Sequence, residues 1–421
     1  MASESTLRFS AQTDEVTSLL RIVNMVRTGE ATTRPEIGRI TGLGRGVVTQ
    51  RIDQAIEMGY LADSELAPST GGRSARTLRF RSEQGLVVVC ALGALHIRVG
   101  IADLDGALIA HAHEAWDIAS GPDKTLARAM ELADGLLVEQ GEAPVWAVTV
   151  GLPGPVDFAT GRPVAPPIMP GWNGFDVRGT VEEHFDAPAW VDNDVNLLVF
   201  GERARRHATE DDLIYCKIGS GIGSGLLSQG RVHRGANGAA GDIGHVRVNG
   251  SKEPCRCGKV GCLEAVAGGW ALVRDARQAI EAENATGQLA DAVRGGAPLT
   301  PEAIARAAEN GDSLAIGLVQ SSARVVGEAA ATLVNVFNPK VFIIGGAAAA
   351  AGELFLAEVR QRVYELSLPL ATRDLQIVPS VNDAQEPLRG GAALAIETLF
   401  VTTFPRWFSG GRPTVQVTAS V

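Results

Sequence analysis

Three of the five cysteines in this chain lie within eight consecutive positions, as Cys255, Cys257 and Cys262, and His245 lies ten residues before the first of them. Three thiolates and one imidazole complete the tetrahedral ligand set of zinc, and such a closed set leaves no position for a catalytic water. Glycines inside the segment permit the chain to reverse tightly between the ligands. These four residues predict one structural zinc ion per chain; the alternative is three unrelated thiols in a glycine-rich loop.

The segments that must position this site show the same order of secondary-structure elements twice. The first set comprises three adjacent strands, a helix and a strand, at 86–92, 97–104, 108–116, about 124–140 and 146–150. The same order returns after Asp212 and ends in a strand at 341–344. Two halves of one order indicate an internal duplication in an α/β domain. The tail after Phe404 shows no convincing period, and we expect 405–421 to be a loose extension.

The first 84 residues have a different pattern. Apolar residues at helical spacing predict three short helices, at 14–27, about 34–41 and about 45–58, with a glycine turn between the second and the third. An alternating segment at 77–81 follows the turn at Gly71 and Gly72, which predicts a two-stranded wing. Together these elements predict a winged helix-turn-helix domain over residues 1–84.

Composition and charge narrow the classes of function. The chain has 421 residues, 45% hydrophobic and 20% charged, which predicts two or three folded domains rather than a disordered chain. No apolar run is long enough to span a bilayer and no signal peptide is apparent, so we expect a cytoplasmic protein without a membrane partner. The net charge is −10, yet residues 1–85 carry 11 arginines against 10 acids. Between Glu65 and Glu83 there are four arginines and no acid, which favours contact with nucleic acid.

Several motifs resemble the signature of the ROK family of repressors, open reading frames and sugar kinases. They occur in the family's order between residue 86 and about 400, at 151–155 (GLPGP), 191–194 (VDND), 219–225 (GSGIGSG), 241–245 (GDIGH), 255–264 (CRCGKVGCLE) and 335–346 (NVFNPKVFIIGG). The resemblance implies a two-lobed, actin-like sugar-kinase fold over 85–404. Its lobes are expected at about 85–200 plus the C-terminal helix and at 201–385. An added N-terminal winged helix marks the repressor branch of the family.

The resemblance also implies a set of sugar-binding residues. Asn193 and Asp194 match the pair that contacts the sugar, and the aspartate is the general base of kinase members. Asp242 matches a sugar-binding position that is usually Glu, so its reach is one methylene shorter. His245 matches a residue that binds zinc through one nitrogen and faces the sugar through the other. Glu264 matches the acid near the anomeric end of the sugar.

The sequence at the end of the first strand distinguishes a sugar kinase from a sensor without kinase activity. Kinase members have an Asp-x-Gly-Gly-Thr loop that holds nucleotide phosphates and magnesium, whereas the aligned residues here are Ala91–Leu95 (ALGAL). The carboxylate, the second glycine and the threonine are absent, so kinase activity is not expected. Two alternatives remain: an active sugar kinase with a DNA-binding appendage, and a protein-binding scaffold that lacks a specific operator.

We therefore expect a sugar-responsive transcriptional regulator of carbohydrate genes, a repressor in the first instance, with a sugar or sugar derivative as effector. The third helix would enter the major groove of double-stranded DNA. One module reads a short half-site, so a homodimer or homotetramer on an inverted repeat is expected. The candidate DNA contacts are Arg45, Thr49 and Gln50 to bases, Arg51 to the backbone, Arg73 to a minor groove, and Arg76, Arg79 and Arg81 to phosphates.

Overall fold

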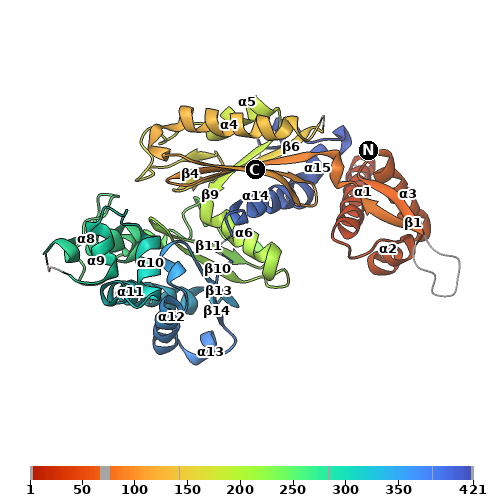
Figure 1. Ribbon diagram of the computed structural model, residues 1–421. Coiled ribbons are helices and arrows are strands. Elements are labelled where there is room, and N and C mark those ends of the chain that lie inside the picture. Colours follow the sequence, from red (N-terminus) through yellow and green to blue (C-terminus); the bar gives the residue numbers. More distant parts are fainter. Residues whose placement is uncertain (1–2, 67–75, 142, 283–284, 382, 419–421) are drawn as a thin grey trace.

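The computed structural model describes residues 3–66, 76–141, 143–282, 285–381 and 383–418. A small N-terminal unit lies at one side of a two-lobed body (Figure 1). Among the described residues, no helix combines the length and apolarity that a membrane span requires.

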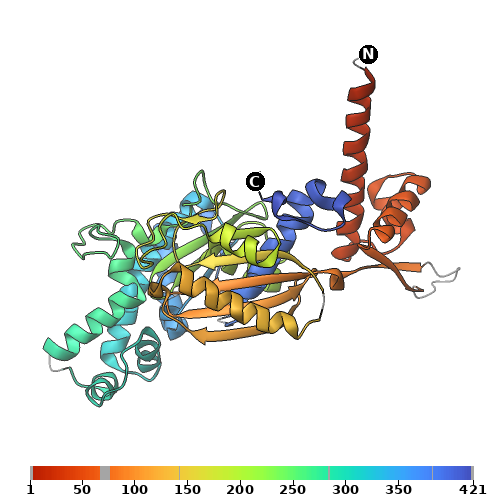
Figure 2. The same cartoon turned by 90° about the horizontal axis from the view of Figure 1, so that it is seen from above.

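The N-terminal unit consists of three helices and a hairpin, as its patterns predicted. They are α1 (Ser3–Arg27), α2 (Arg34–Thr41), α3 (Arg45–Glu57), β1 (Leu61–Leu66) and β2 (Arg76–Phe80), with the two strands antiparallel. A capping box between Thr33 and Glu36 begins α2, and Gly42 ends it in the left-handed conformation. Helix α1 begins well before the expected position 14 and projects from the body (Figure 2). The predicted turn of the wing, with Gly71 and Gly72, lies outside the described residues.

The first lobe contains a five-stranded sheet of order β5-β4-β3-β6-β9. Its elements are β3 (Leu86–Leu92), β4 (His96–Asp103), β5 (Leu108–Ala115), α4 (Pro122–Val138), β6 (Val145–Leu152), α5 (Val177–Phe185) and β9 (Ala189–Asn193), with a small hairpin β7 (Val156–Asp157) and β8 (Arg162–Pro163). All seven residues of β3 are buried, because helices cover both faces of the sheet.

The second lobe repeats this topology as β12-β11-β10-β13-β14, again with three antiparallel strands followed by parallel ones. The strands are β10 (Leu213–Ile218), β11 (Ile222–Ser228), β12 (Arg231–Val232), β13 (Val341–Gly345) and β14 (Gln376–Pro379). The helices are α7 (Leu263–Ala267), α8 (Gly269–Ala282), α9 (Gln288–Arg294), α10 (Pro301–Glu309), α11 (Ser313–Phe337), α12 (Glu353–Leu366) and α13 (Pro369–Thr372). The identical order in both lobes confirms the predicted duplication and the actin-like α/β fold.

Two helices cross at the junction of the lobes. Helix α6 (Asp194–Arg206) leads from the first sheet to the second, and α14 (Glu386–Glu397) returns the chain to the first lobe and packs on α6 and β3. A side chain at Gly390 would collide with the carbonyl of Leu197, so the close crossing requires glycine there.

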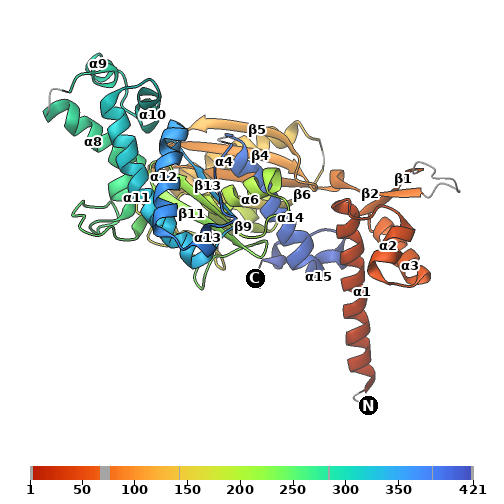
Figure 3. The same cartoon turned by 90° about the horizontal axis from the view of Figure 1, so that it is seen from below.

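The expectation of a loose C-terminal tail is wrong. A π-helical turn (Thr398–Thr403) continues α14 into α15 (Phe404–Trp407), which lies between α14 and α1 (Figure 3). Trp407 and Val417 are each 3% exposed. The hydroxyl of Tyr60 donates a hydrogen bond to the carbonyl of Phe408 at 2.9 Å, so the tail joins the N-terminal unit to the first lobe.

Candidate functional site

A cavity of about 100 Å³ lies between the two lobes, and every residue predicted to bind sugar lines it. Loops after strands of the first lobe and the glycine-rich turn before β11 supply most of its wall. The predicted residues that line it are Asn193, Asp194, Asp242, His245 and Glu264. Because the chain segments around 193, 242 and 264 are separated in sequence, it is the fold that brings these polar side chains together in one cavity.

Local hydrogen bonds fix two of these side chains. Asn193 donates to the carbonyl of Gly154 at 3.1 Å and caps α6 by accepting from the amide of Val195 at 3.1 Å. The carboxylate of Glu264 accepts from the amide of Ile222 at 3.1 Å, which ties α7 to the glycine-rich turn. Asp242 is exposed at the rim of the cavity.

Asp194 does not stand free in the cavity. Its Oδ2 lies 2.5 Å from Nζ of Lys217 on β10, and the two side chains are 12% and 29% exposed. This ion pair occupies one of the two oxygens of the carboxylate. Sequence reasoning missed Lys217, although a single charge inside the apolar strand Leu213–Ile218, next to the glycine-rich turn, was a usable signal.

Two further basic residues lie near this pair. His96 contacts Arg98 on β4, and both side chains are half-buried. Burial, together with the positive charges of Arg98 and Lys217, lowers the pKa of His96 to about 3. The turn that precedes β4 contains Leu95, whose side chain is exposed. Arg98 and Lys217 therefore place positive charge beside His96 and Asp194.

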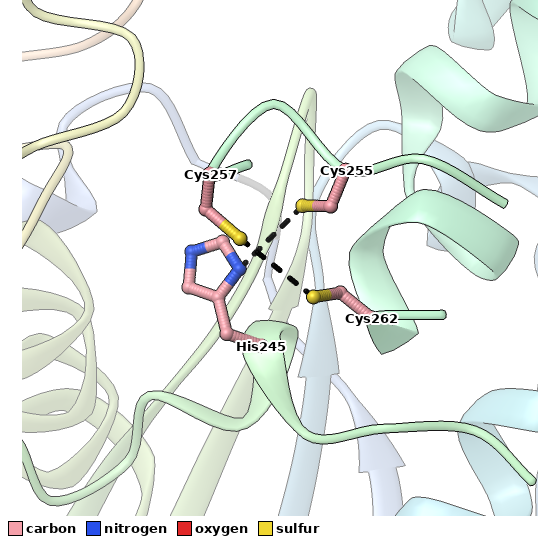
Figure 4. Close-up of side chains that lie close together, drawn as sticks. All are labelled: His245, Cys255, Cys257 and Cys262. Carbon is pink, nitrogen blue, oxygen red and sulfur yellow. Dashed lines mark hydrogen bonds between the residues drawn. The ribbon is translucent and has the colours of Figure 1, made fainter. Parts of the chain in front are cut away.

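The cysteines and the histidine predicted to bind metal come together beside the cavity (Figure 4). One ligand atom from each of His245, Cys255, Cys257 and Cys262 lies within 4.8 Å of the others. Sγ of Cys255 is 3.7 Å from Nδ1 of His245, and Sγ of Cys257 is 3.7 Å from Sγ of Cys262.

The surroundings of this cluster suit a cation. Burial raises the pKa of the Cys255 and Cys262 thiols, so a bound metal ion is what would hold them as thiolates. Two backbone hydrogen bonds close the loop into a knuckle. The amide of Cys255 donates to the carbonyl of Lys259 at 2.8 Å, and the amide of Gly261 donates to the carbonyl of Glu253 at 2.7 Å. The donor set and its closed geometry fit a structural zinc ion.

Comparison with known proteins identifies the family that has this architecture. The model of the ROK family matches residues 88–398. The chain belongs to the ROK family. It is 26% identical over 395 residues to the xylose repressor of Caldicellulosiruptor bescii, covering 92% of this chain and 97% of that protein.

Two solved structures share the ROK fold. A ROK transcriptional regulator, a homologue of the Escherichia coli MLC protein, superimposes with a TM-score of 0.80 at 23% identity, over 92% of this chain and 96% of the other. A ROK glucokinase from Streptomyces griseus, in complex with glucose and AMPPNP, has a TM-score of 0.64 at 28% identity. The glucokinase aligns over 99% of its own length but over only 74% of this chain. The regulator thus accounts for a larger part of this ROK chain than the kinase does.

Outside the ROK match, α3 presents most of the side chains predicted to read DNA. Arg45, Thr49 and Gln50 are exposed on this helix, and Arg76 on β2 is 71% exposed. Arg73 lies outside the described residues.

Arg51, predicted to contact the DNA backbone, is paired with α1 in the structure. Its guanidinium lies 2.6 Å from the carboxylate of Glu15 and donates to Ser18, and its side chain is only 12% exposed. Because α1 supplies this partner, Arg51 braces α3 against α1. The guanidinium of Arg79 is also paired, with the carboxylate of Glu83 at 3.0 Å.

Proposed function

We propose that this ROK protein is a transcriptional regulator, a repressor in the first instance, that binds operator DNA and a sugar or sugar derivative. In this proposal residues 1–84 form the DNA-binding domain, 85–404 form the effector domain, and the protein acts in the cytoplasm. The observation that carries the proposal is the extent of the similarity to the xylose repressor, which runs through both parts of the chain.

The effector would lie between the lobes. Asn193, Asp194, Asp242 and Glu264 offer amide and carboxylate groups on several sides of one cavity, which is how buried sugar hydroxyls are bound and discriminated. His245 would contribute Nε2, since its Nδ1 faces the sulfur atoms.

A kinase role is the second candidate because Asp194, the residue that matches the kinase base, is retained. Two features weigh against it. A general base must accept a proton from the sugar hydroxyl, and one oxygen of the Asp194 carboxylate is already engaged by the ammonium group of Lys217 at 2.5 Å. The Ala91–Leu95 turn offers neither a carboxylate for magnesium nor a hydroxyl for phosphate. We propose that Asp194 accepts a hydrogen bond from the effector and transfers no proton.

We propose one structural zinc ion per chain, held by His245, Cys255, Cys257 and Cys262. The ion would keep the three thiols deprotonated and would fix the knuckle that carries both His245 and the start of α7. Glu264, in the first turn of that helix, would then be held toward the cavity. In this role the metal orders the effector site and supplies no catalytic water.

We propose that α3 reads the major groove through Arg45, Thr49 and Gln50, with Arg76 and the wing residue Arg73 on the adjacent backbone and minor groove. A homodimer or homotetramer would place two such units on an inverted repeat. Closure of the lobes around the effector would change the spacing of the two units, because the C-terminal tail fixes each unit to its first lobe.

The experiment uses the full chain purified with its metal. Thermal-shift measurements against neutral monosaccharides and their phosphates identify the effector, and a coupled assay with ATP follows phosphorylation of the same panel. We expect at least one sugar to raise the melting temperature without turnover. Brisk ATP-dependent phosphorylation of that sugar would instead establish the kinase function.

A further inference from the structure

A second cavity lies at the junction where the N-terminal unit meets both lobes. Its volume is about 950 Å³. None of its lining residues lines the cavity between the lobes that contains Asn193, Asp194 and Glu264, which we call the sugar cavity. The C-terminal ends of α1 and α6, one side of α14, the β4–β5 turn at Asp105–Ala107 and the β11–β12 turn at Gln229–Arg231 form its walls. We call this cavity the junction groove.

Arginine dominates the charge of the junction groove. Five arginines line it against three acids, Asp105, Asp211 and Glu397, which gives a net of +2 in a chain whose net charge is −10. The arginines come from both lobes and from the N-terminal unit, as Arg27, Arg203, Arg205, Arg231 and Arg389. Such a local excess of positive over negative side chains attracts anions.

Two of the five guanidinium groups are already neutralised. Arg203 lies 2.9 Å from the carboxylate of Asp211, and Arg205 lies 2.7 Å from that of Asp383. Within the described ranges, the other three form no ion pair with a carboxylate. Arg27 donates to the amide oxygen of Asn24 at 3.1 Å. Arg389 and Arg231 are the other two cations without such a pair, and the charge of Glu397 acts on both Arg27 and Arg231 from a longer distance.

These cations are held in place rather than loosely solvated. The guanidinium of Arg27 packs over the ring of Phe400 at 5.7 Å, and burial lowers its pKa. Arg389 is fixed through its bond to the amide oxygen of Gln385 at 2.6 Å, and its Nε is buried without a hydrogen-bond partner among the described residues. A buried donor of this kind is costly unless a ligand satisfies it. Arg231 is exposed at the opposite wall.

We propose that the junction groove binds a small polyphosphate, either inorganic or carried by a nucleotide, as a second effector. Planar guanidinium groups match phosphoryl oxygens in pairs, and three of them on separate elements fit a ligand with two or more phosphoryl groups. Because the guanidinium of Arg27 is partly buried against the aromatic ring of Phe400, a DNA backbone or an acidic protein segment fits the groove less well than a small anion does.

A ligand in this groove would bridge the units that transmit the signal. Arg27 is the last residue of α1 in the N-terminal unit, and Arg231 is the first residue of β12 in the second lobe. Any movement of the second lobe toward the first changes the distance between these two groups. Polyphosphate binding and sugar binding are then coupled, and each changes the affinity of the other by the same factor.

Calorimetric titration of the full chain with pyrophosphate, at low salt and without added divalent cations, tests the proposal. Arg231→Gln removes a cation that pairs with no carboxylate among the described residues, and Arg306→Gln on α10 is a matched control, an arginine outside both cavities. We expect Arg231→Gln to weaken binding about tenfold, as the loss of one guanidinium–phosphate contact implies, and Arg306→Gln to leave it unchanged. A second titration with ATP distinguishes a nucleotide ligand, which binds more tightly, from an inorganic one.

Three results would overturn the proposal: no binding of either probe below millimolar concentration, equal loss in both variants, or loss in Lys217→Met with retention in Arg231→Gln. The last result would place the anion in the sugar cavity instead. Because the sugar-induced thermal shift is measured separately on the same proteins, a failure here leaves the proposed regulator function standing.

Discussion

Replacing Trp407 with alanine tests how the DNA-binding unit is fixed to the body. The indole is 3% exposed, and its ring centroid lies 6.0 Å from that of Tyr60 and 5.0 Å from that of Phe404. Its Nε1 donates to the carbonyl of Leu399 at 3.3 Å. This one side chain therefore contacts the N-terminal unit and the tail, and it also packs on Trp146 of the first lobe, at 5.6 Å.

The size of the effect follows from this burial. Truncation of a buried tryptophan to alanine costs about 3–5 kcal/mol. Because the tail is a peripheral segment, we expect the loss to appear first as undocking of 404–417 rather than as unfolding of the lobes. A loss of about 3 kcal/mol raises the undocked population about 150-fold.

Amide hydrogen exchange of the segment 398–418 measures this population directly. The matched control is Trp172→Ala, which removes a fully buried indole whose Nε1 donates to Ile118 at 3.2 Å inside the first lobe. We expect at least roughly tenfold faster exchange of the tail in Trp407→Ala and unchanged exchange of the tail in the control. Exchange that stays within about threefold of the parent chain in Trp407→Ala would refute the docking argument.

Three further predictions concern the effector site. Cys257→Ser should release bound zinc, read by metal analysis, and should abolish the sugar-induced thermal shift; retention of both would contradict the anchoring role of the metal. Asp194→Asn should weaken effector binding in calorimetry by roughly tenfold or more, the usual effect of removing a charged hydrogen-bond acceptor, and equal affinity would exclude a contact at Asp194. His96 has a folded-state pKa of about 3, below its ordinary 6.5, so the unfolded chain takes up the proton first as pH falls. The stability from this group is complete above pH 6.5 and is lost as pH falls from there toward 3; urea midpoints should decline less steeply in His96→Gln, and identical slopes would count against a buried neutral imidazole.

Much of the fold could be predicted because its signals are local. Short windows of sequence are enough to identify the three helices with their caps and glycine turns, and also the apolar strands. The order of elements that is repeated after Asp212 follows from these local signals. The metal ligands were also accessible, since a thiol-rich segment in a chain with few other cysteines is typical of a metal site. The sugar-side residues came from motif resemblance, and the structure groups them in one cavity.

The features that escaped prediction depend on contacts between distant segments. The tail lacks an extended period, and its aromatic residues at 400, 404, 407 and 408 become informative only once Tyr60 and Trp146 are seen beside them. The pairing of Arg51 with Glu15 and that of Lys217 with Asp194 arise in the same way. Helical spacing identifies which residues share a face, but it does not identify the charge that another element places opposite them.

The most direct test of the regulator function is a mobility-shift titration of the full chain on duplex DNA from upstream of its own neighbouring genes, with and without the sugar found by thermal shift. We predict a complex with one duplex that resists scrambled competitor DNA and whose affinity changes when the sugar is added. Equal binding to scrambled duplex, unaltered by any sugar that the protein binds, would contradict the proposal.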